Sequence, residues 1–140
     1  MINEQSYGII LLHKKKDGSL DVLIVKWAGY WGFPKWHIEA GETPLITALR
    51  ELHEETWIKD VTIDESKIFK DQYMFINKKR TINKHVWYFI AYTPNKKVVL
   101  DKRELSEYRR CSLSDASDLL TFPSAIAIIE SVIAYLGYGK

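Results

Sequence analysis

The sequence predicts an α/β protein in which a mixed β-sheet carries helices on both faces, and three observations support this prediction. Two apolar, β-branched segments near the start, residues 7–12 and 22–27, are typical of strands. Residues 43–56 have the apolar spacing of a helix, and further strand-like segments follow them. A second helical segment, residues 123–136, closes the chain. This order of elements is typical of a sheet between layers of helices.

The first two strands are expected to form a hairpin, because residues 14–19 between them contain the turn-forming pair Asp17-Gly18. Residues 28–34 hold two glycines and a proline, and are expected to be irregular. The helix that follows has a good N-cap in Thr43. Its first position is Pro44, where the missing backbone N–H costs nothing.

The second half of the chain is expected to supply the rest of the sheet. Residues 68–76 and 81–92 read as strands joined by a basic turn. The second of them is so apolar that we expect it to be central and covered on both faces. Residues 98–100 are a candidate edge strand, and residues 107–113 a last strand.

Two helices are expected after this last strand. Ser114 or Asp115 can cap a short helix that reaches Leu120. Pro123 can open the final helix, and Gly137 can end it, because glycine readily takes the left-handed conformation found at helix ends.

Composition sets limits on the kind of protein. The chain has 140 residues, 46% hydrophobic and 27% charged, which fits one globular domain. Its formal net charge of +2 is too small to indicate a nucleic-acid-binding protein. Lysine and arginine cluster at residues 14–16, 78–80 and 96–97, and we interpret these clusters as solvated hairpin tips.

The sequence also bears on the compartment. Cys111 is the only cysteine, so no internal disulfide can form, which fits a reducing environment. The first residues do not have the pattern of a secretory signal. The apolar run in residues 125–136 is too short to span a bilayer. We therefore expect a soluble, cytoplasmic protein.

Carboxylates crowd into one stretch, residues 33–58, which contains Glu39, Glu42, Glu51, Glu54 and Glu55. Helical geometry places Glu51, Glu54 and Glu55 on one flank, and Arg50 can reach Glu54 one turn further on. A solvated acidic face is one interpretation. The other is a site for Mg²⁺, which prefers oxygen ligands and can neutralise phosphate oxygens and activate water.

This stretch resembles the Nudix hydrolase signature. That signature runs Gly, five residues, Glu, seven residues, Arg-Glu, an aliphatic, any residue, Glu-Glu, any residue, Gly and an aliphatic. Glu42 falls on its first Glu, Arg50-Glu51 on its Arg-Glu pair and Glu54-Glu55 on its Glu-Glu pair. The resemblance implies a Nudix-type α/β/α sandwich with a mixed β-sheet, formed by a single domain of residues 1–140.

The resemblance also implies a reaction and the residues that carry it out. Nudix hydrolases cleave a nucleoside diphosphate linked to another group, with water attacking a phosphorus. Carried over by position, Glu51, Glu54 and Glu55 would bind Mg²⁺ or Mn²⁺. Glu54, or a glutamate elsewhere in the chain, would act as the base, and Arg50 would orient a glutamate through an ion pair.

Other segments resemble the asymmetrical diadenosine tetraphosphate hydrolases: residues 31–35, 84–89 and 107–109. The resemblance implies cleavage of diadenosine tetraphosphate to ATP and AMP. Lys35 and Lys84 would lie near phosphates, where lysine acts as a point charge. His37 is a further candidate substrate contact. The aromatic residues expected near adenine, where ring faces stack on bases, are Tyr73, Tyr88 and Phe122.

The sequence departs from the family pattern at three positions. Trp36 and Trp57 stand where the signature has its two glycines, and Arg110 stands where the tetraphosphate hydrolases usually have tryptophan. A bulky residue in the left-handed conformation at a helix end costs on the order of 1–2 kcal/mol. Two alternatives therefore accompany the hydrolase hypothesis. One is a catalytically weak nucleotide-binding protein, and the other, based on the lysine clusters, is an RNA 5′-pyrophosphohydrolase.

Overall fold

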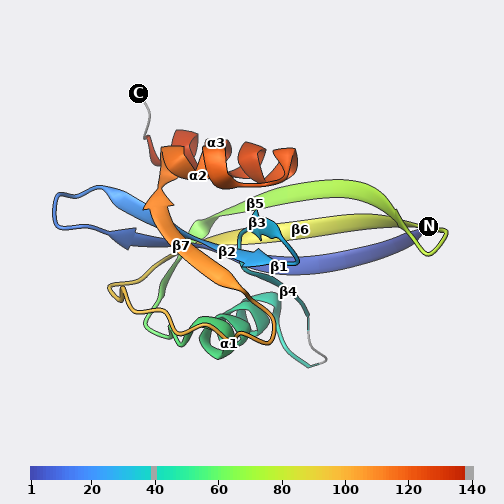
Figure 1. Ribbon diagram of the computed structural model, residues 1–140, viewed down its shortest axis with the longest axis horizontal. Helices are drawn as coiled ribbons and strands as arrows, with labels where there is room; N and C mark the ends of the chain where they lie inside the picture. Colours follow the sequence, from blue (N-terminus) through green and yellow to red (C-terminus); the bar gives the residue numbers. More distant parts are fainter. Residues whose placement is uncertain (39–40, 138–140) are drawn as a thin grey trace.

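The computed structural model describes residues 1–38 and 41–137 of the chain. A seven-stranded sheet has the order β3-β2-β1-β6-β5, with β4 paired to β1 and β7 paired to β2. Helix α1 covers one face of the sheet, and α2 and α3 cover the other (Figure 1). The expected α/β/α sandwich is confirmed. The elements are β1 (Ile2–Lys14), β2 (Leu20–Trp27), β3 (Tyr30–Gly32), β4 (Lys35–His37), α1 (Pro44–Thr56), β5 (Thr62–Asn77), β6 (Arg80–Tyr92), β7 (Glu107–Ser112), α2 (Leu113–Leu119) and α3 (Pro123–Leu136).

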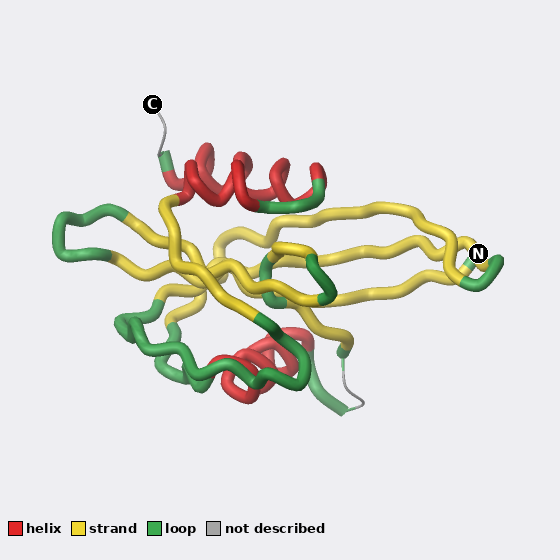
Figure 2. Tube along the Cα trace, in the orientation of Figure 1, coloured by secondary structure: helices red, strands yellow, loops and turns green. Residues whose placement is uncertain are grey.

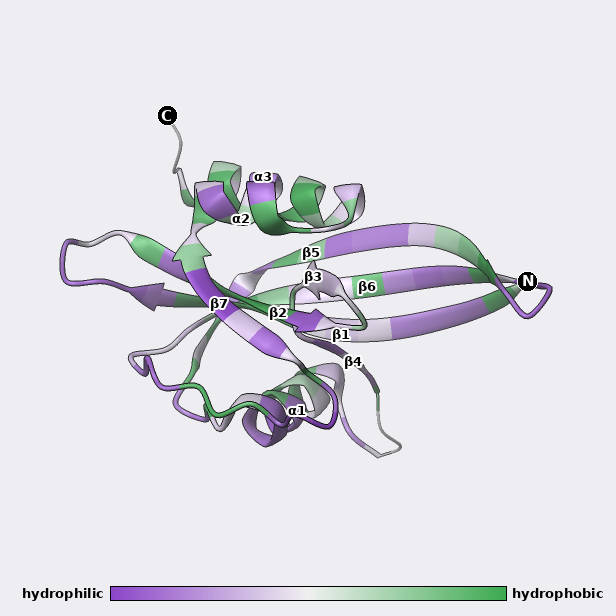
Figure 3. Cartoon of the chain, in the orientation of Figure 1, coloured by the Kyte–Doolittle hydropathy of each residue, from purple (hydrophilic) through white to green (hydrophobic). Residues whose placement is uncertain are grey.

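The sheet is mixed, as the sequence predicts. Strands β1 and β6 pair in parallel, from Ile2 opposite Ile82 to Leu12 opposite Tyr92. The pairs of β1 with β2 and of β5 with β6 are antiparallel. Strands β1, β5 and β6 run far beyond the helices and form a three-stranded arm (Figure 2). Hydrophilic residues cover much of this arm (Figure 3).

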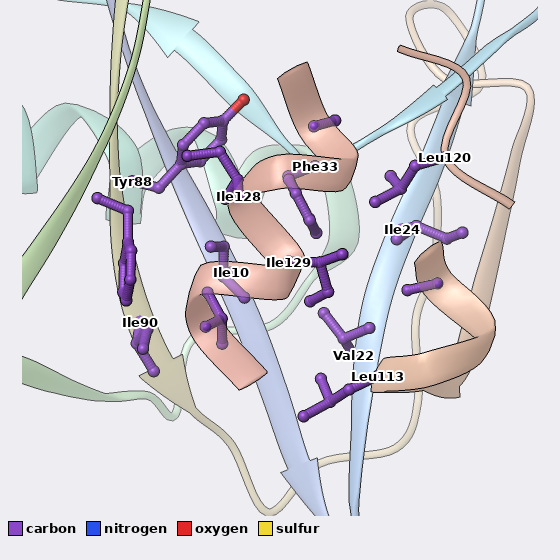
Figure 4. Packing of buried hydrophobic residues seen from close by; sticks show 14 of the residues in the cluster. Ile10, Val22, Ile24, Phe33, Tyr88, Ile90, Leu113, Leu120, Ile128 and Ile129 are labelled. Carbon is purple, nitrogen blue, oxygen red and sulfur yellow. The ribbon is translucent and has the colours of Figure 1, made fainter. Parts of the chain in front are cut away.

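Strand β1 separates two hydrophobic cores, because successive side chains of a strand point to opposite faces. Ile10 and Leu12 face α2 and α3, whereas Ile9 and Leu11 face α1. In the first core, Ile128 and Ile129 of α3 pack towards the sheet (Figure 4). The second core is completed by Ala48, Leu52 and Trp36.

Gly8 lies in the middle of β1 at a point of close approach. A Cβ atom added there would lie 2.6 Å from a ring carbon of Tyr88 and 2.7 Å from the carbonyl oxygen of Pro34. The neighbouring Ile9 N–H donates to the same Pro34 carbonyl at 3.0 Å. The absent side chain therefore allows β6 and the start of β4 to close on β1.

The prediction that residues 81–92 are covered on both faces is wrong for half of the strand. On the α3 face of β6, Val86, Tyr88 and Ile90 are buried. On the other face, His85 and Trp87 are only half-buried, because α1 does not extend over the arm (Figure 1). Trp87 instead stacks on Tyr7 across the strand pair, with ring centroids 5.2 Å apart.

Residues 98–100 do not form the expected edge strand. This segment runs along the end of α1 instead. The Val99 N–H donates to the Thr56 carbonyl at 3.1 Å, and the Asp101 N–H donates to the Glu55 carbonyl at 2.9 Å. Carbonyl groups at a helix end lack partners within the helix. The segment therefore satisfies the end of α1 rather than extending the sheet.

Smaller differences concern the ends of elements. Ser112 caps α2 by accepting a hydrogen bond from the Asp115 N–H at 3.1 Å, so the expected caps, Ser114 or Asp115, are wrong by two or three residues. Residues 30–32, expected to be irregular, form β3. Helix α3 begins at Pro123 and ends before Gly137 as predicted. No helix in residues 1–38 and 41–137 has the length and apolar character needed to cross a membrane.

Candidate active site

Helix α1 begins as predicted and places the glutamates. The Thr43 hydroxyl accepts a hydrogen bond from the Ile46 N–H at 3.2 Å, and Pro44 occupies the first turn. Ala48 and Leu52 are fully buried against the sheet. This fixes the rotation of the helix about its axis. Glu51 and Glu55 thus lie at the margin of the core, whereas Glu54 faces outward with 53% of its side chain exposed.

Arg50 gathers three of the carboxylates. Its guanidinium donates to Glu42 at 2.8 and 3.1 Å and to Glu54 at 2.9 Å, and it lies 3.2 Å from Glu51. The hydrogen bond from Arg50 holds the pKa of Glu42 below its usual value. The predicted pair between Arg50 and Glu54 is confirmed. Arg50 therefore links the start of the site to two turns of α1.

A second group of carboxylates lies deeper. Burial raises the pKa of Glu55 to about 8, and a hydrogen bond with Glu104 adds to this shift, while a hydrogen bond from Trp36 opposes it. Burial also raises the pKa of Glu51, and the charge of Glu104 contributes in the same direction. Glu51, Glu55 and Glu104 therefore influence one another across a small, poorly solvated space.

A cavity of about 200 Å³ lies beside two of these carboxylates. Glu55 and Glu104 line it together with Trp36, Lys35 and Trp27. Among residues 1–38 and 41–137, no three acidic, histidine or cysteine side chains converge closely enough to hold a metal ion as they stand. Arg50 accounts for part of this arrangement, because it draws Glu42 and Glu54 towards itself.

The two tryptophans at the glycine positions have different environments. Trp36 belongs to strand β4 opposite Tyr7 and is only 8% exposed. Trp57 follows the last turn of α1 in the left-handed conformation, with φ 67° and ψ 5°, and is 69% exposed. Trp57 thus keeps the backbone conformation of the glycine that it replaces, with its ring turned to solvent.

A larger cavity of about 700 Å³ adjoins the first, and Trp27, Phe33 and Lys35 line both. Five of the six predicted substrate-binding residues line this larger cavity: Lys35, Lys84, Tyr73, Tyr88 and Phe122. They come from β4, β5, β6 and the start of α3, so the fold unites residues that are far apart in the sequence. The Phe33 and Tyr88 rings meet edge to face, with centroids 5.5 Å apart.

The two lysines of the larger cavity are held differently. Lys35 Nζ lies 3.1 Å from the Tyr73 hydroxyl and 5.8 Å from the centre of the Trp27 ring. Lys84 is buried and lies 3.5 Å from Glu4. Burial lowers the pKa of both lysines. An anion entering the cavity would meet two poorly hydrated ammonium groups, which strengthens electrostatic attraction.

His37 does not line either cavity and is exposed at the end of β4. Glu39 lies outside the described residues. Arg110 stands where the tetraphosphate hydrolases usually have tryptophan, and its guanidinium donates to the Asn95 carbonyl at 2.5 Å. This hydrogen bond ties β7 to the loop after β6.

Sequence reasoning missed three residues of the site. Glu104 reaches the smaller cavity from the loop before β7, Trp27 forms a wall common to both cavities, and Asp71 lines the larger one. Only the resemblance hinted at Glu104, since it allows a base outside the signature. The spacing of Trp27 and Asp71 contains no comparable signal, because each looks like an ordinary strand residue.

The match to known proteins agrees with this geometry. Residues 3–131 match the model of the NUDIX domain. The chain therefore belongs to the Nudix family. It is a Nudix hydrolase, an enzyme class that acts on nucleoside polyphosphates and generally uses divalent metal ions.

Three known proteins are similar to this chain over most of its length. The asymmetrical bis(5′-nucleosyl)-tetraphosphatase of Mus musculus is 27% identical over 124 residues, which cover 86% of this chain and 83% of that protein. The protein of the same name from Sus scrofa is 35% identical over 104 residues, covering 72% and 68%. The crystal structure of a C. elegans Ap4A hydrolase binary complex superposes with a TM-score of 0.78 at 22% identity, covering 96% of this chain and 98% of that one.

Proposed function

We propose that residues 1–140 act as a single domain that hydrolyses dinucleoside polyphosphates, with diadenosine tetraphosphate cleaved to ATP and AMP in the presence of Mg²⁺ or Mn²⁺. The observation that carries this proposal is the joining of two cavities through Trp27, Phe33 and Lys35. The smaller cavity contains the carboxylates of Glu55 and Glu104, and the larger one contains two lysines and several aromatic rings. A nucleotide with a long phosphate chain fits such a pair.

The carboxylate cavity has the donor chemistry that a hard divalent cation requires. Glu55 and Glu104 line this cavity, and with Glu51, which lies on the same helix as Glu55, they would supply oxygen ligands. A bound cation would offset the burial, and relieve the repulsion, that together raise the pKa of Glu51 and Glu55. When bound, such a cation neutralises phosphate oxygens and lowers the pKa of a bound water. Glu54 is the fourth candidate ligand, from the signature itself.

Two carboxylates are candidates for the general base. Glu54 is the candidate from the signature, and its carboxylate is oriented by Arg50 at 2.9 Å. Glu104 is the candidate from the geometry, because it faces the cavity beside Glu55. Either carboxylate could accept a proton from the attacking water, which is the role of a general base.

The larger cavity would bind the rest of the substrate. Lys35 lies where the two cavities meet and would neutralise the phosphate chain. Lys84 would provide a second positive charge. Tyr73, Tyr88 and Phe122 offer ring faces or edges to a nucleobase. The names of the mouse and pig relatives support this substrate class.

The products identify the reaction. Purified protein incubated with diadenosine tetraphosphate and Mg²⁺ should release equal amounts of ATP and AMP, measured by anion-exchange chromatography. Release of two ADP molecules per substrate would contradict the asymmetrical cleavage. A Glu55→Gln variant serves as a site control, and Glu65→Gln, a substitution of an exposed glutamate on β5, serves as a surface control.

Separate substitutions distinguish the two candidate bases. Glu54→Gln should lower kcat by about 100-fold or more if Glu54 is the base, because a general base contributes roughly 10²–10⁴-fold. Glu104→Gln should do so if Glu104 is the base. A Glu54→Gln variant whose kcat stays within a few-fold of wild type, beside an inactive Glu104→Gln variant, would assign the role to Glu104.

Trp36 supports a second candidate, a nucleotide-binding protein with weak catalysis, because its side chain lines the smaller cavity. If this ring obstructs the site, Trp36→Gly should raise turnover strongly. Nucleotide binding without turnover in Mg²⁺ or Mn²⁺ would support this candidate. The RNA alternative gains no support from the lysine clusters, since Lys15, Lys78 and Lys79 lie in hairpin turns.

A further inference from the structure

Asp71 is the acidic residue of the larger cavity. Among the described residues that line this cavity, it is the only aspartate or glutamate, and the other charged side chains are two lysines. It lies in β5 opposite Val86 of β6, two residues from Tyr73, so Asp71 and Tyr73 point to the same face of the sheet. Asp71 therefore brings a negative charge into a cavity whose other charges are positive.

The carboxylate of Asp71 is not occupied by either lysine. Lys84 lies 3.5 Å from Glu4, and Lys35 donates to the Tyr73 hydroxyl at 3.1 Å. In the part of the chain that the structure describes, no hydrogen bond or ion pair reaches the Asp71 carboxylate. Burial raises the pKa of Tyr73, and the negative charge of Asp71 adds to this increase, which agrees with their shared place in the cavity. Both oxygens of Asp71 are therefore available to a bound molecule.

The chemistry of a carboxylate limits what that molecule can be. An ionised aspartate accepts hydrogen bonds and donates none, and it repels phosphate oxygens. The part of a dinucleoside polyphosphate that suits it is therefore a nucleoside. Guanine has two adjacent donors on one edge, N1–H and the 2-amino group, which match the two oxygens of a carboxylate. Adenine has one donor on the corresponding edge, the 6-amino group, beside an acceptor that a carboxylate oxygen repels.

Aromatic rings of the same cavity can hold a base beside this carboxylate. Tyr73 and Phe75 follow Asp71 on the same face of β5, with ring centroids 6.0 Å apart. Tyr30 and Phe122 form another pair of rings, with centroids 5.0 Å apart, and line the same cavity. Stacking on ring faces tolerates every base, because every base has a π-face. The choice between bases therefore falls to polar groups that meet the edge of the base.

We propose that Asp71 is a specificity-determining residue, which makes the larger cavity prefer guanine to adenine. This inference rests on the proposed function, because it assumes that the larger cavity holds a nucleoside of the substrate. Diadenosine tetraphosphate stays a substrate, and tetraphosphates that carry guanosine are preferred. A purine without the second donor leaves one oxygen of a half-buried carboxylate without a partner, and sites built to hydrogen-bond a substrate group reject analogues that lack it.

A mixed substrate tests this preference within one molecule. Ap4G carries adenosine at one end and guanosine at the other. Its hydrolysis with one water gives ATP and GMP, or GTP and AMP, depending on which end occupies the larger cavity. Wild-type protein with Mg²⁺ should form one of these product pairs in about tenfold excess or more, measured by anion-exchange chromatography. This ratio does not change when a variant loses activity towards both ends equally.

Asp71→Asn should shift the ratio by about tenfold or more towards the opposite product pair, because hydrogen bonds to the charged group are lost. A carboxamide has one acceptor and one donor, which match the 6-amino group and N1 of adenine. Asp118→Asn is the matched control. It makes the same chemical change at an exposed position of α2 that lines neither cavity, and it should keep the wild-type ratio.

Two results overturn the inference. One is a wild-type product ratio near one. The other is an Asp71→Asn variant that keeps the wild-type ratio, even if its kcat/KM falls, because the carboxylate then acts on the ribose or on the fold and not on the base. If the wild-type protein cleaves neither Ap4A nor Ap4G, the proposed function itself fails and this inference falls with it.

A second substrate on the wild-type protein covers the case in which Asp71→Asn does not fold. Inosine lacks the 2-amino group of guanosine, so the excess of one product pair should fall by about tenfold when Ap4I replaces Ap4G. An excess of the same size with both substrates overturns the inference.

Discussion

Trp36 and Trp57 flank the same set of glutamates and replace the same residue type, yet their surroundings differ in every respect. Trp36 lies in an extended strand, buried between the sheet and α1. Trp57 is exposed and occupies the left-handed conformation that closes α1, with its N–H donating to the His53 carbonyl at 2.8 Å. The first tryptophan is held by packing, and the second is strained by its backbone.

The difference shows that a glycine in a motif has two separate uses. At the end of a helix, glycine lowers the cost of the left-handed conformation, and any other residue must bear that cost. Position 36 lies in strand β4, where the backbone is not left-handed, so a side chain meets no backbone strain there. The same substitution thus costs backbone energy at one end and adds contacts at the other.

The largest effect is expected from Trp36→Gly. Removing a buried tryptophan side chain should lower the free energy of unfolding by about 3–5 kcal/mol, because a cavity remains in the core under α1. Chemical denaturation without metal measures this change. A loss below about 1 kcal/mol would mean that Trp36 is not a core residue, and the contrast with Trp57 would disappear.

Trp57→Gly should have the opposite sign. Glycine accepts the left-handed conformation, and the exposed ring has little packing to lose, so we expect the protein to gain about 1 kcal/mol of stability. The same denaturation experiment measures this gain in stability. The kinetic constants of the Trp57→Gly variant towards nucleotides should stay those of wild type. A destabilised Trp57→Gly variant would show that the exposed ring has a contact worth more than the strain.

The smallest change in stability is expected from Trp57→Phe. Trp57→Phe keeps the strained backbone and changes only an exposed ring, so the free energy of unfolding should shift by less than about 0.5 kcal/mol. Mn²⁺ affinity, measured by electron paramagnetic resonance without nucleotide, should also be unchanged. A weakened Mn²⁺ affinity in Trp57→Phe would mean that the end of α1 contributes to the site through more than its backbone.

Local signals in the sequence predicted much of the fold. Thr43 and Pro44 marked the start of α1 correctly, because a cap and a first-turn proline act through neighbouring residues only. Pro123 and Gly137 marked α3 for the same reason. Residues 98–100 misled the prediction. Their β-branched composition suits a strand, but their partners are the carbonyl groups at the end of α1.

The same difference between local signals and long-range contacts applies to the candidate site. The spacing of Arg50 and Glu54 along one helix predicted their contact. The place of Lys84 and Tyr88 in the larger cavity followed from the resemblance. Glu104 could not be found by spacing, because it is 49 residues from Glu55 and reaches it only through the folding of β5, β6 and the loop before β7.

Gly8 limits which substitutions the walls of the two cavities can accommodate. It lines neither of the two cavities described above, yet a single added carbon at this position would press on the Tyr88 ring and on the Pro34 carbonyl. Tyr88 lines the larger cavity and Pro34 the smaller one. A substitution at position 8 would therefore disturb the walls of both cavities at once, through a residue that lines neither of them.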